Sequence, residues 1–293
     1  YKLNNLNMKI IKYFFEYIFT FISFSLFKIL GLKISSKISG KIFEKIGPMF
    51  RSKQIIHSNI KRAFPDIDKQ NLDKIINSMW NNYGRIFAEY IFIKDFREGK
   101  FNSNILVEGQ EIIEDLVKNE KQVVFISGHL ANFELMAMHL ERSGIKLSAI
   151  YRPLNNIFLN NKMEKIRKNY ICKYQIKKGL GGIKNLISLK RKKFSTALMI
   201  DQRVTEGILS KFFNKEALTT TIPAQIVKKF KTPIIPVYIE RIEDIKFKII
   251  IKKQINFSEN ESIQEITDKL NKIFEEMVLK NPEQWIWSHN RWK

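Results

Sequence analysis

Residues 122–134, Gln122-Val-Val-Phe-Ile-Ser-Gly-His-Leu-Ala-Asn-Phe-Glu134, join a short apolar run to a glycine, a histidine and a glutamate. An uninterrupted apolar run of this length is typical of a strand that is buried on both faces. The residues from Leu130 to Arg142 have helical spacing, so the stretch predicts a strand, a turn at Gly128-His129 and a helix. Side chains just beyond the carboxyl end of such a strand lie in the crevice where α/β proteins bind ligands.

The sequence after this stretch continues to alternate strands with helices. We expect strands at residues 146–151, 173–177 and 196–200, the last ending at Asp201, and a strand pair at 233–241 and 246–257. Residues 35–100 have a helical pattern with loops at 47–48 and 64–66. Further helices are expected at 156–170, from 179–182 onward and at 262–280. This order predicts an α/β fold with a central mixed sheet flanked by helices.

The most apolar stretch is residues 13–32, interrupted only by Glu16 and Lys28 near its ends. About 20 apolar residues are needed to cross a bilayer, and the absence of a small-residue cleavage site argues against a signal peptide. Basic residues are denser after the stretch than before it, which places the remainder of the chain in the cytoplasm. We therefore predict a membrane anchor at residues 1–34, transmembrane or interfacial, and a cytoplasm-facing domain at residues 35–293. A buried core helix is the alternative. Because the sequence begins with Tyr1, we expect either a fragment or translation that starts at Met8.

The chain is strongly basic, with a formal net charge of +22 over 293 residues. Such a charge favours an acidic partner: nucleic acid, an anionic membrane, a phosphorylated substrate or an acidic carrier protein. Lysine greatly outnumbers arginine, as in AT-rich genomes, which weakens this argument. Residues 151–193 nevertheless hold 13 Lys or Arg and one acidic residue, Glu164. We interpret this segment as an electrostatic footprint for phosphates or an acidic carrier, with a solvated helix face as the alternative.

His129 is the candidate general base. Glu134 follows five positions later, a spacing that places two residues on different faces of a regular helix. They can meet only if His129 lies in the turn and Glu134 in the first turns of the helix, where Glu134 would orient the imidazole. A structural turn histidine is the alternative.

Cys172 is the only cysteine, so a disulfide within the chain and a cysteine-based zinc cluster are excluded. The spacing of His129, Glu134 and His139 does not suit a metal site either.

Two long motifs stand out: Gly128-His-Leu-Ala-Asn-Phe-Glu-Leu135 and Pro282-Glu-Gln-Trp-Ile-Trp-Ser-His-Asn-Arg-Trp-Lys293. With other segments in the same order, they make nearly the whole chain resemble the late acyltransferases of lipid A biosynthesis, the lauroyl and myristoyl transferase group. Two positions depart from that pattern, since Asn214 stands where the family usually has glycine and Asn290 replaces a frequent arginine. The other matching segments are Asn59–Pro65, Trp80–Arg85 with Glu89, Tyr151-Arg-Pro153 with Arg167, Asp201-Gln202, and Phe212-Phe213 with Ala217 and Thr219.

The resemblance implies a glycerolipid-acyltransferase-like fold at the inner membrane. It implies transfer of a fatty acyl group from acyl carrier protein to a hydroxyl on a hydroxyacyl chain of a Kdo-bearing lipid A precursor, an anionic lipid. No metal or other cofactor is expected, because the thioester donor is already activated. His129 and Glu134 are then the catalytic pair. The residues implied to contact substrate are Asn132, Arg152, Arg167, Asp201 and Thr219.

Two other classes of function fit part of the sequence. An acyltransferase with the same His-x4-Glu chemistry on another phospholipid or glycolipid would need the same residues. A non-enzymatic basic protein, associated with a membrane or with nucleic acid, would explain the charge but not the ordered motifs. Aromatic residues occur in apolar runs and do not alternate with basic ones, so we expect no nucleic-acid partner.

Overall fold

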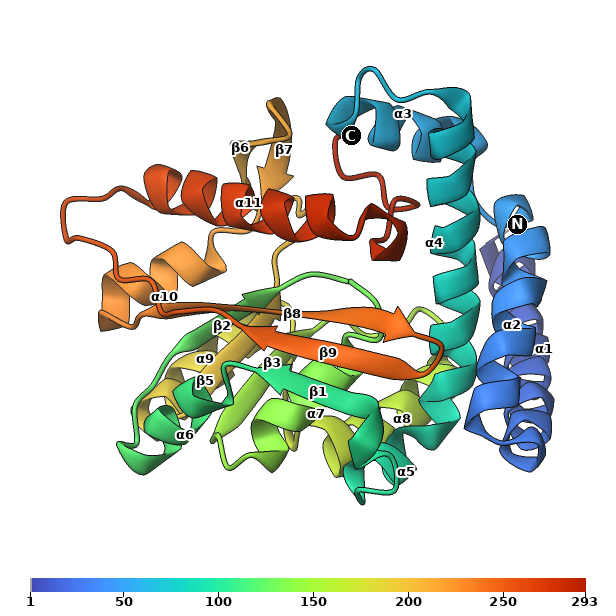
Figure 1. Ribbon diagram of the computed structural model, residues 1–293, viewed down its shortest axis with the longest axis horizontal. Helices are drawn as coiled ribbons and strands as arrows, with labels where there is room; N and C mark the ends of the chain where they lie inside the picture. The colour runs from blue at the N-terminus through green and yellow to red at the C-terminus, as the bar shows by residue number, and fades with distance from the viewer. Residues whose placement is uncertain (1) are drawn as a thin grey trace.

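The computed structural model describes residues 2–293, and side chains are described from residue 8 onward except at positions 180 and 183. Its centre is a seven-stranded sheet in the order β1-β9-β8-β2-β5-β3-β4 (Figure 1). All neighbours are parallel except β8 and β9, so the predicted mixed sheet is confirmed. The strands are β1 (Ile105–Glu108), β2 (Val124–Ser127), β3 (Leu147–Tyr151), β4 (Tyr174–Lys177), β5 (Ser195–Met199), β8 (Ile234–Glu243) and β9 (Lys246–Ile251).

Helices cover both faces of this sheet, so the predicted α/β class is also confirmed. The four residues of β2 are all buried. Val124 and Ile126 belong to one apolar cluster, whereas Phe125 belongs to the cluster on the other face, as the alternation of side chains along a strand requires. The helices are α1 (Lys2–Leu30), α2 (Leu32–Ile46), α3 (Lys53–Ala63), α4 (Lys69–Glu89), α5 (Ile93–Arg97), α6 (Gln110–Lys118), α7 (Glu134–Arg142), α8 (Ile157–Ile166), α9 (Leu180–Arg191), α10 (Ile222–Phe230) and α11 (Ile263–Lys280).

A separate hairpin of β6 (Ile208–Phe212) and β7 (Lys215–Thr219) packs on α11 and was not expected from the sequence. Its two turn residues, Phe213 and Asn214, have φ values of 50° and 56°. Two successive residues with positive φ are typical of the tight turns that fit strand twist. Asparagine tolerates this conformation better than most residues, so Asn214 is accommodated where the related sequences usually have glycine.

The helix expected from Leu130 begins four residues later, at Glu134. Leu130 instead forms a bridge with Trp285, and the amide of Ala131 donates to the carbonyl of Gln284 at 3.1 Å. Ala131 has a φ of 40°, which lies outside the range of a right-handed α-helix. The C-terminal segment therefore holds residues 130–133 in an open turn.

The N-terminal helices α1 and α2 lie side by side along one flank of the domain (Figure 1). Small residues let α2 approach α4 closely. Ser39 of α2 is buried, and a Cβ added to Gly84 of α4 would lie 2.2 Å from the carbonyl oxygen of Ser39. Residues 8–30 of α1 are long and apolar enough to cross a membrane, by length and composition. The outward side chains of α1 are exposed, so the alternative of a buried core helix is wrong.

Candidate active site

The turn after β2 begins with a glycine that the packing requires. A Cβ on Gly128 would lie 2.1 Å from the ring of Phe274 and 3.1 Å from the Cβ of Asp201. A larger residue would push this turn away from the core. Gly128 thus lets the chain pass close to α11 and places His129 at the carboxyl end of the central strand.

Asp201 holds the imidazole of His129. Strand β5 lies parallel to β2 and ends just before Asp201, so both residues leave the same edge of the sheet. Nδ1 of His129 lies 2.9 Å from Oδ1 of Asp201, and the backbone N–H of His129 donates to Oδ2 at 2.8 Å. Trp285 donates its indole N–H to the same Oδ2 at 3.0 Å. The carboxylate is thereby fixed on three sides, and Nε2 of His129 is left for chemistry.

The electrostatics of this pair follow from its burial. Burial disfavours the imidazolium, but the Asp201 carboxylate outweighs it, and the pKa of His129 lies above its ordinary value. Burial likewise disfavours the Asp201 carboxylate, but His129 and the hydrogen-bond donors around it lower the pKa of Asp201 to about 2. Asp201 is therefore ionised at every physiological pH and stabilises a proton on His129.

Glu134 binds Arg167, which corrects the expected contact with His129. Oε1 of Glu134 accepts from Nε of Arg167 at 2.9 Å and also from Nη2. No hydrogen bond joins His129 to Glu134 within residues 8–293. The reason is positional, since Glu134 is the first residue of α7 and reaches toward the end of α8, whereas Asp201 lies beside the ring. The Glu134 carboxylate raises the pKa of Arg167 despite burial, so this guanidinium stays charged.

His129, Glu134 and Arg167 share an apolar cavity of about 430 Å³. The ring of Phe133 stands edge-on to His129 with centroids 4.7 Å apart. The cavity walls come from the N-terminal helices and from α4 and α8, so segments far apart in sequence enclose it. The other lining residues are Tyr17, Thr20, Phe21, Phe24, Phe43, Tyr83, Ile86, Phe87, Tyr90, Leu159, Lys162, Met163, Ile166 and Ile286.

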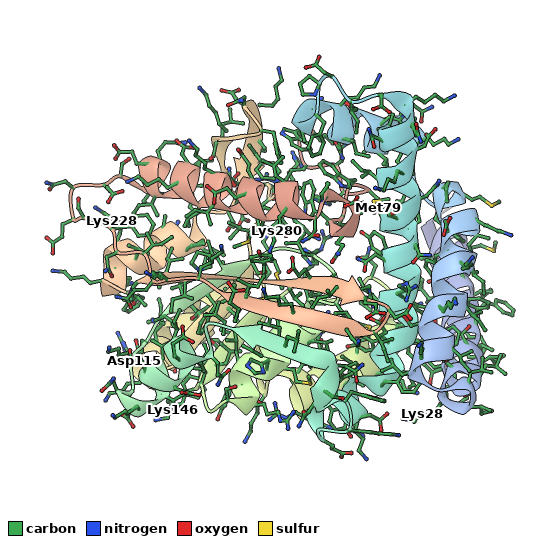
Figure 2. All side chains as sticks on the ribbon, viewed as in Figure 1. Lys28, Met79, Asp115, Lys146, Lys228 and Lys280 are labelled. Atoms are coloured by element: carbon green, nitrogen blue, oxygen red, sulfur yellow. The ribbon has the colours of Figure 1, made fainter. Side chains whose placement is uncertain are left out.

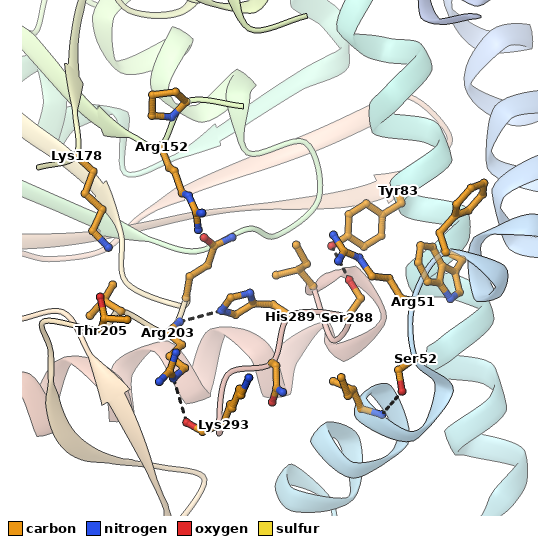
Figure 3. A pocket seen from close by; sticks show the side chains of 18 of the residues that line it. Arg51, Ser52, Tyr83, Arg152, Lys178, Arg203, Thr205, Ser288, His289 and Lys293 are labelled. Atoms are coloured by element: carbon orange, nitrogen blue, oxygen red, sulfur yellow. Dashed lines mark hydrogen bonds between the residues drawn. The ribbon is translucent and has the colours of Figure 1, made fainter. Parts of the chain in front are cut away.

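A larger basic cleft of about 1160 Å³ adjoins this cavity, because Phe43, Tyr83 and Ile286 line both. Its cations are Arg51, Arg152, Lys178, Arg203 and Lys293, whereas Glu206 is the one carboxylate side chain among its described lining residues. Figure 3 shows Arg152, Lys178 and Arg203 around the same space as His289. The backbone N–H of Arg203 donates to Nε2 of His289 at 2.9 Å. This arrangement favours an anionic ligand.

The sequence-predicted residues thus fall into three groups. His129, Glu134 and Arg167 line the apolar cavity, and Arg152 lines the basic cleft. Asp201 lies behind His129 with its side chain fully buried. Asn132 and Thr219 are buried and line neither space.

Asn132 and Thr219 make internal contacts. The amide of Asn132 donates to Oε2 of Glu89 at 3.0 Å. Oγ1 of Thr219 accepts from the guanidinium of Arg291 at 2.7 Å and from Asn271 at 3.1 Å. Both side chains are thus hydrogen-bonded to buried partners, and their contact with substrate stays a prediction.

Three residues of the site were not proposed for it from the sequence: Trp285, Glu89 and His289. Trp285 reaches Asp201, and Glu89 links Asn132 to Arg241 and Ser36. All three belong to segments that resemble the lipid A acyltransferases, which is the one signal that marks them. His289 lies far in sequence from Arg203, which it meets in the cleft. Among the described residues, no group of three His, Cys, Asp or Glu side chains could hold a metal ion.

A histidine that follows a central strand and lines an apolar cavity fits the class of acyltransferases, and the chain's relatives are acyltransferases. The model of the bacterial lipid A biosynthesis acyltransferase family matches residues 4–293, so the chain belongs to this family. It is 21% identical to lipid A biosynthesis acyltransferase 2 of Shigella flexneri, covering 78% of this chain and 74% of that protein. It is 20% identical to the lipid A biosynthesis myristoyltransferase of Escherichia coli K12, covering 85% and 76%. The 1-acyl-sn-glycerophosphate acyltransferase PlsC of Thermotoga maritima is similar over 85% of this chain and 98% of its own, with 14% identity and a TM-score of 0.41.

Proposed function

We propose that this enzyme transfers a fatty acyl chain from acyl carrier protein to a hydroxyl of a hydroxyacyl chain on a Kdo-bearing lipid A precursor. The observation that carries the proposal is the position of His129, which Asp201 holds at the wall of an apolar cavity that adjoins a basic cleft. One space suits a hydrocarbon chain and the other suits a phosphorylated headgroup. The reacting atoms would meet between them, beside Nε2.

In the proposed reaction, Nε2 of His129 removes the proton of the acceptor hydroxyl as its oxygen attacks the thioester carbonyl. The carbonyl oxygen becomes an oxyanion, and we assign its stabilisation to Arg167, a charged guanidinium that Glu134 holds in the same cavity. One such donor contributes about 3 kcal/mol to transition-state stability. The intermediate then expels the thiolate, which takes the proton from the imidazolium. Asp201 stabilises that imidazolium throughout.

The basic cleft is assigned to the acceptor's anionic headgroup. Arg152 is exposed at the end of β3 with Lys178 close by, and burial lowers the pKa of Lys178. Both belong to the basic segment 151–193, so that segment contributes at least two cations to the cleft. At its other end Lys190 is buried, with only 3% of its surface exposed, and residues 190–193 are not among the residues that line the cleft. The phosphate footprint is therefore proposed for Arg152 and Lys178.

We place the enzyme at the inner membrane with residues 35–293 facing the cytoplasm, the side on which acyl carrier protein is found. The support is the exposed apolar surface of α1 together with the basic residues that follow it. No nucleic-acid partner and no cofactor is needed for this chemistry.

The proposal is tested by incubating the purified full-length protein with acyl-acyl carrier protein and a Kdo-bearing lipid A precursor. Mass spectrometry should show one added acyl chain in ester linkage. Parallel reactions would replace the donor by acyl-coenzyme A and the acceptor by lysophosphatidic acid. Faster acylation of lysophosphatidic acid would assign the enzyme to another lipid and contradict the proposed acceptor.

A further inference from the structure

The exposed face of α2 carries two rows of side chains. Lysines recur at every fourth position from residue 33 to residue 45, and isoleucines do so from residue 34 to residue 42. Residues four apart lie on the same face of a helix, so the two rows run side by side. All seven side chains are exposed, and the exposed fractions of Ile34, Ile38 and Ile42 are 52%, 42% and 46%.

The apolar row continues onto neighbouring segments. Just beyond α2, Met49 and Phe50 are 83% and 70% exposed. The outward face of α1, beside α2, is apolar along its described length. Its large exposed side chains are Met8, Ile10, Ile11, Phe14, Phe15, Ile18, Phe19, Phe21, Ile22, Leu26, Ile29 and Leu30. Residues 8–50 thus carry exposed apolar side chains on α1, on α2 and just beyond α2, together with the exposed lysine row.

Helix α1 is bound sideways to the folded domain. Near its middle, the amide of Asn156 donates to the carbonyl of Tyr13 at 2.9 Å. Near its end, Lys28 pairs with Asp95. These contacts lie fifteen residues apart in α1, about 22 Å along a helix, so the domain lies beside the C-terminal half of α1, from Tyr13 to Lys28 (Figure 1). If α1 crossed a bilayer, this flank and the lysine row would be drawn into hydrocarbon, which is costly for charged groups.

We propose that α1 and α2 form a single membrane-binding surface, residues 8–50, that lies in the plane of an anionic bilayer without crossing it. The apolar side chains enter the boundary between headgroups and acyl chains, and the lysines extend to lipid phosphates. The lysine row is complementary in charge to anionic lipid. A second copy of the same face would instead bring two lysine rows together. The inference rests on the membrane association proposed above and not on acyl transfer.

The orientation is tested by labelling single cysteines with a membrane-impermeant maleimide in sealed inner-membrane vesicles of both orientations. The variants are Lys9→Cys in α1 and Lys118→Cys in α6, in the full chain. Cys172 serves as a silent background, because it is buried and burial raises the pKa of its thiol to about 12. Both variants should be labelled from the same side. Labelling of Lys9→Cys from the opposite side, or from neither side, would overturn the in-plane assignment.

The lysine row is tested by binding of the full chain to vesicles of phosphatidylcholine with about 30% phosphatidylglycerol. Changing Lys33, Lys37, Lys41 and Lys45 to Gln should weaken binding at least about ten-fold. The matched control changes Lys118, Lys192, Lys229 and Lys253 to Gln, which removes the same charge from exposed positions outside α1 and α2. One control residue, Lys229, lies in α10. Its neighbour Lys228 in the same helix lies across the molecule from Lys28 of α1 (Figure 2).

Equal losses in the two quadruple variants would overturn the lysine-row assignment. A chain that binds no vesicles and is dimeric in solution would assign the apolar face to a second copy. Acyl transfer is measured separately with detergent-dispersed substrates, so failure of the proposed reaction is recognised independently of membrane binding.

Discussion

The imidazole of His129 has one nitrogen, Nδ1, hydrogen-bonded to Asp201, and its other nitrogen, Nε2, can accept a proton. Nδ1 lies 2.9 Å from Asp201, an ionised carboxylate that accepts hydrogen bonds only, so Nδ1 carries the proton and Nε2 is the basic nitrogen. Glu134 meets Arg167 in the same cavity. The site therefore contains two carboxylates with different partners, one behind the base and one behind a cation.

The pH dependence of acyl transfer follows from the raised pKa of His129. The base must be unprotonated, so kcat/KM should fall as the pH drops through that pKa. Because Asp201 raises the pKa of His129 above 6.5, the acidic limb should lie above pH 6.5. Asp201→Asn removes the charge, so the limb should shift to lower pH. A pH–rate profile with the same limb in both proteins would contradict this assignment.

Glu134→Gln tests the second carboxylate. The amide keeps the shape but removes the charge that orients Arg167, so we expect acyl transfer to slow by about ten-fold, or ~1.4 kcal/mol. The acidic limb should move to lower pH by less than in Asp201→Asn, because the Glu134 charge raises the pKa of His129 less than Asp201 does and makes no hydrogen bond to it. A limb shifted as far as that of Asp201→Asn would show that Glu134 acts through His129 after all.

At the scale of elements, buried Glu89 connects four segments. Its carboxylate accepts from Arg241 of β8 at 2.6 and 3.0 Å, from Ser36 of α2 at 2.7 Å and from Asn132 in the turn beside His129 at 3.0 Å. Glu89 itself ends α4. The N-terminal helices and the turn of the active site are thereby attached to the same side chain.

Glu89→Ala should lower the free energy of unfolding by about 3–5 kcal/mol, since it leaves the largely buried Arg241 without a partner. Thermal or denaturant unfolding of the purified protein measures this loss. The matched control is Glu259→Ala, which removes the fully exposed pair with Lys231 and should leave stability unchanged. Similar effects of the two changes would contradict the role of Glu89.

The elements also show what the sequence predicts and what it does not. The apolar run at residues 124–127 and the helical periodicity before the sheet predicted β2 and the helices correctly, because burial determines those patterns. The hairpin β6–β7 depends on contacts with α11 that no local pattern reveals. Asp201 was expected to end a strand, but its hydrogen bond to His129 requires β5 beside β2. Strand order is a long-range property, and periodicity carries no information about it.

At the scale of the whole molecule, the apolar cavity depends on the N-terminal helix. Tyr17, Thr20, Phe21 and Phe24 of α1 form one of its walls. The proposed membrane attachment and acyl-chain binding therefore both use α1, whose Phe21 is half exposed and also lines the cavity. The division into an anchor at residues 1–34 and a domain at residues 35–293 stays a prediction, and residues from both parts line the cavity.

Deleting residues 1–32 should therefore do more than release the protein from membranes. If about four methylene groups of the acyl chain lose apolar contacts, binding weakens by about 3 kcal/mol, or roughly 10²-fold in the KM for the donor. Fractionation in high salt and assays in detergent measure the two effects separately. A truncated protein with wild-type kinetics would exclude α1 from the acyl-binding wall.

The central claim is that His129, held by Asp201, is the general base of acyl transfer, and the initial rate of folded His129→Ala tests it most directly. The rate is measured by mass spectrometry of the acylated lipid, with a thermal melt to confirm folding. We expect a loss of about 10² to 10⁴ with a near-normal melting temperature. Adding Asp201→Asn should slow the enzyme little further, because the two residues act as a unit. A wild-type rate in folded His129→Ala would contradict the account.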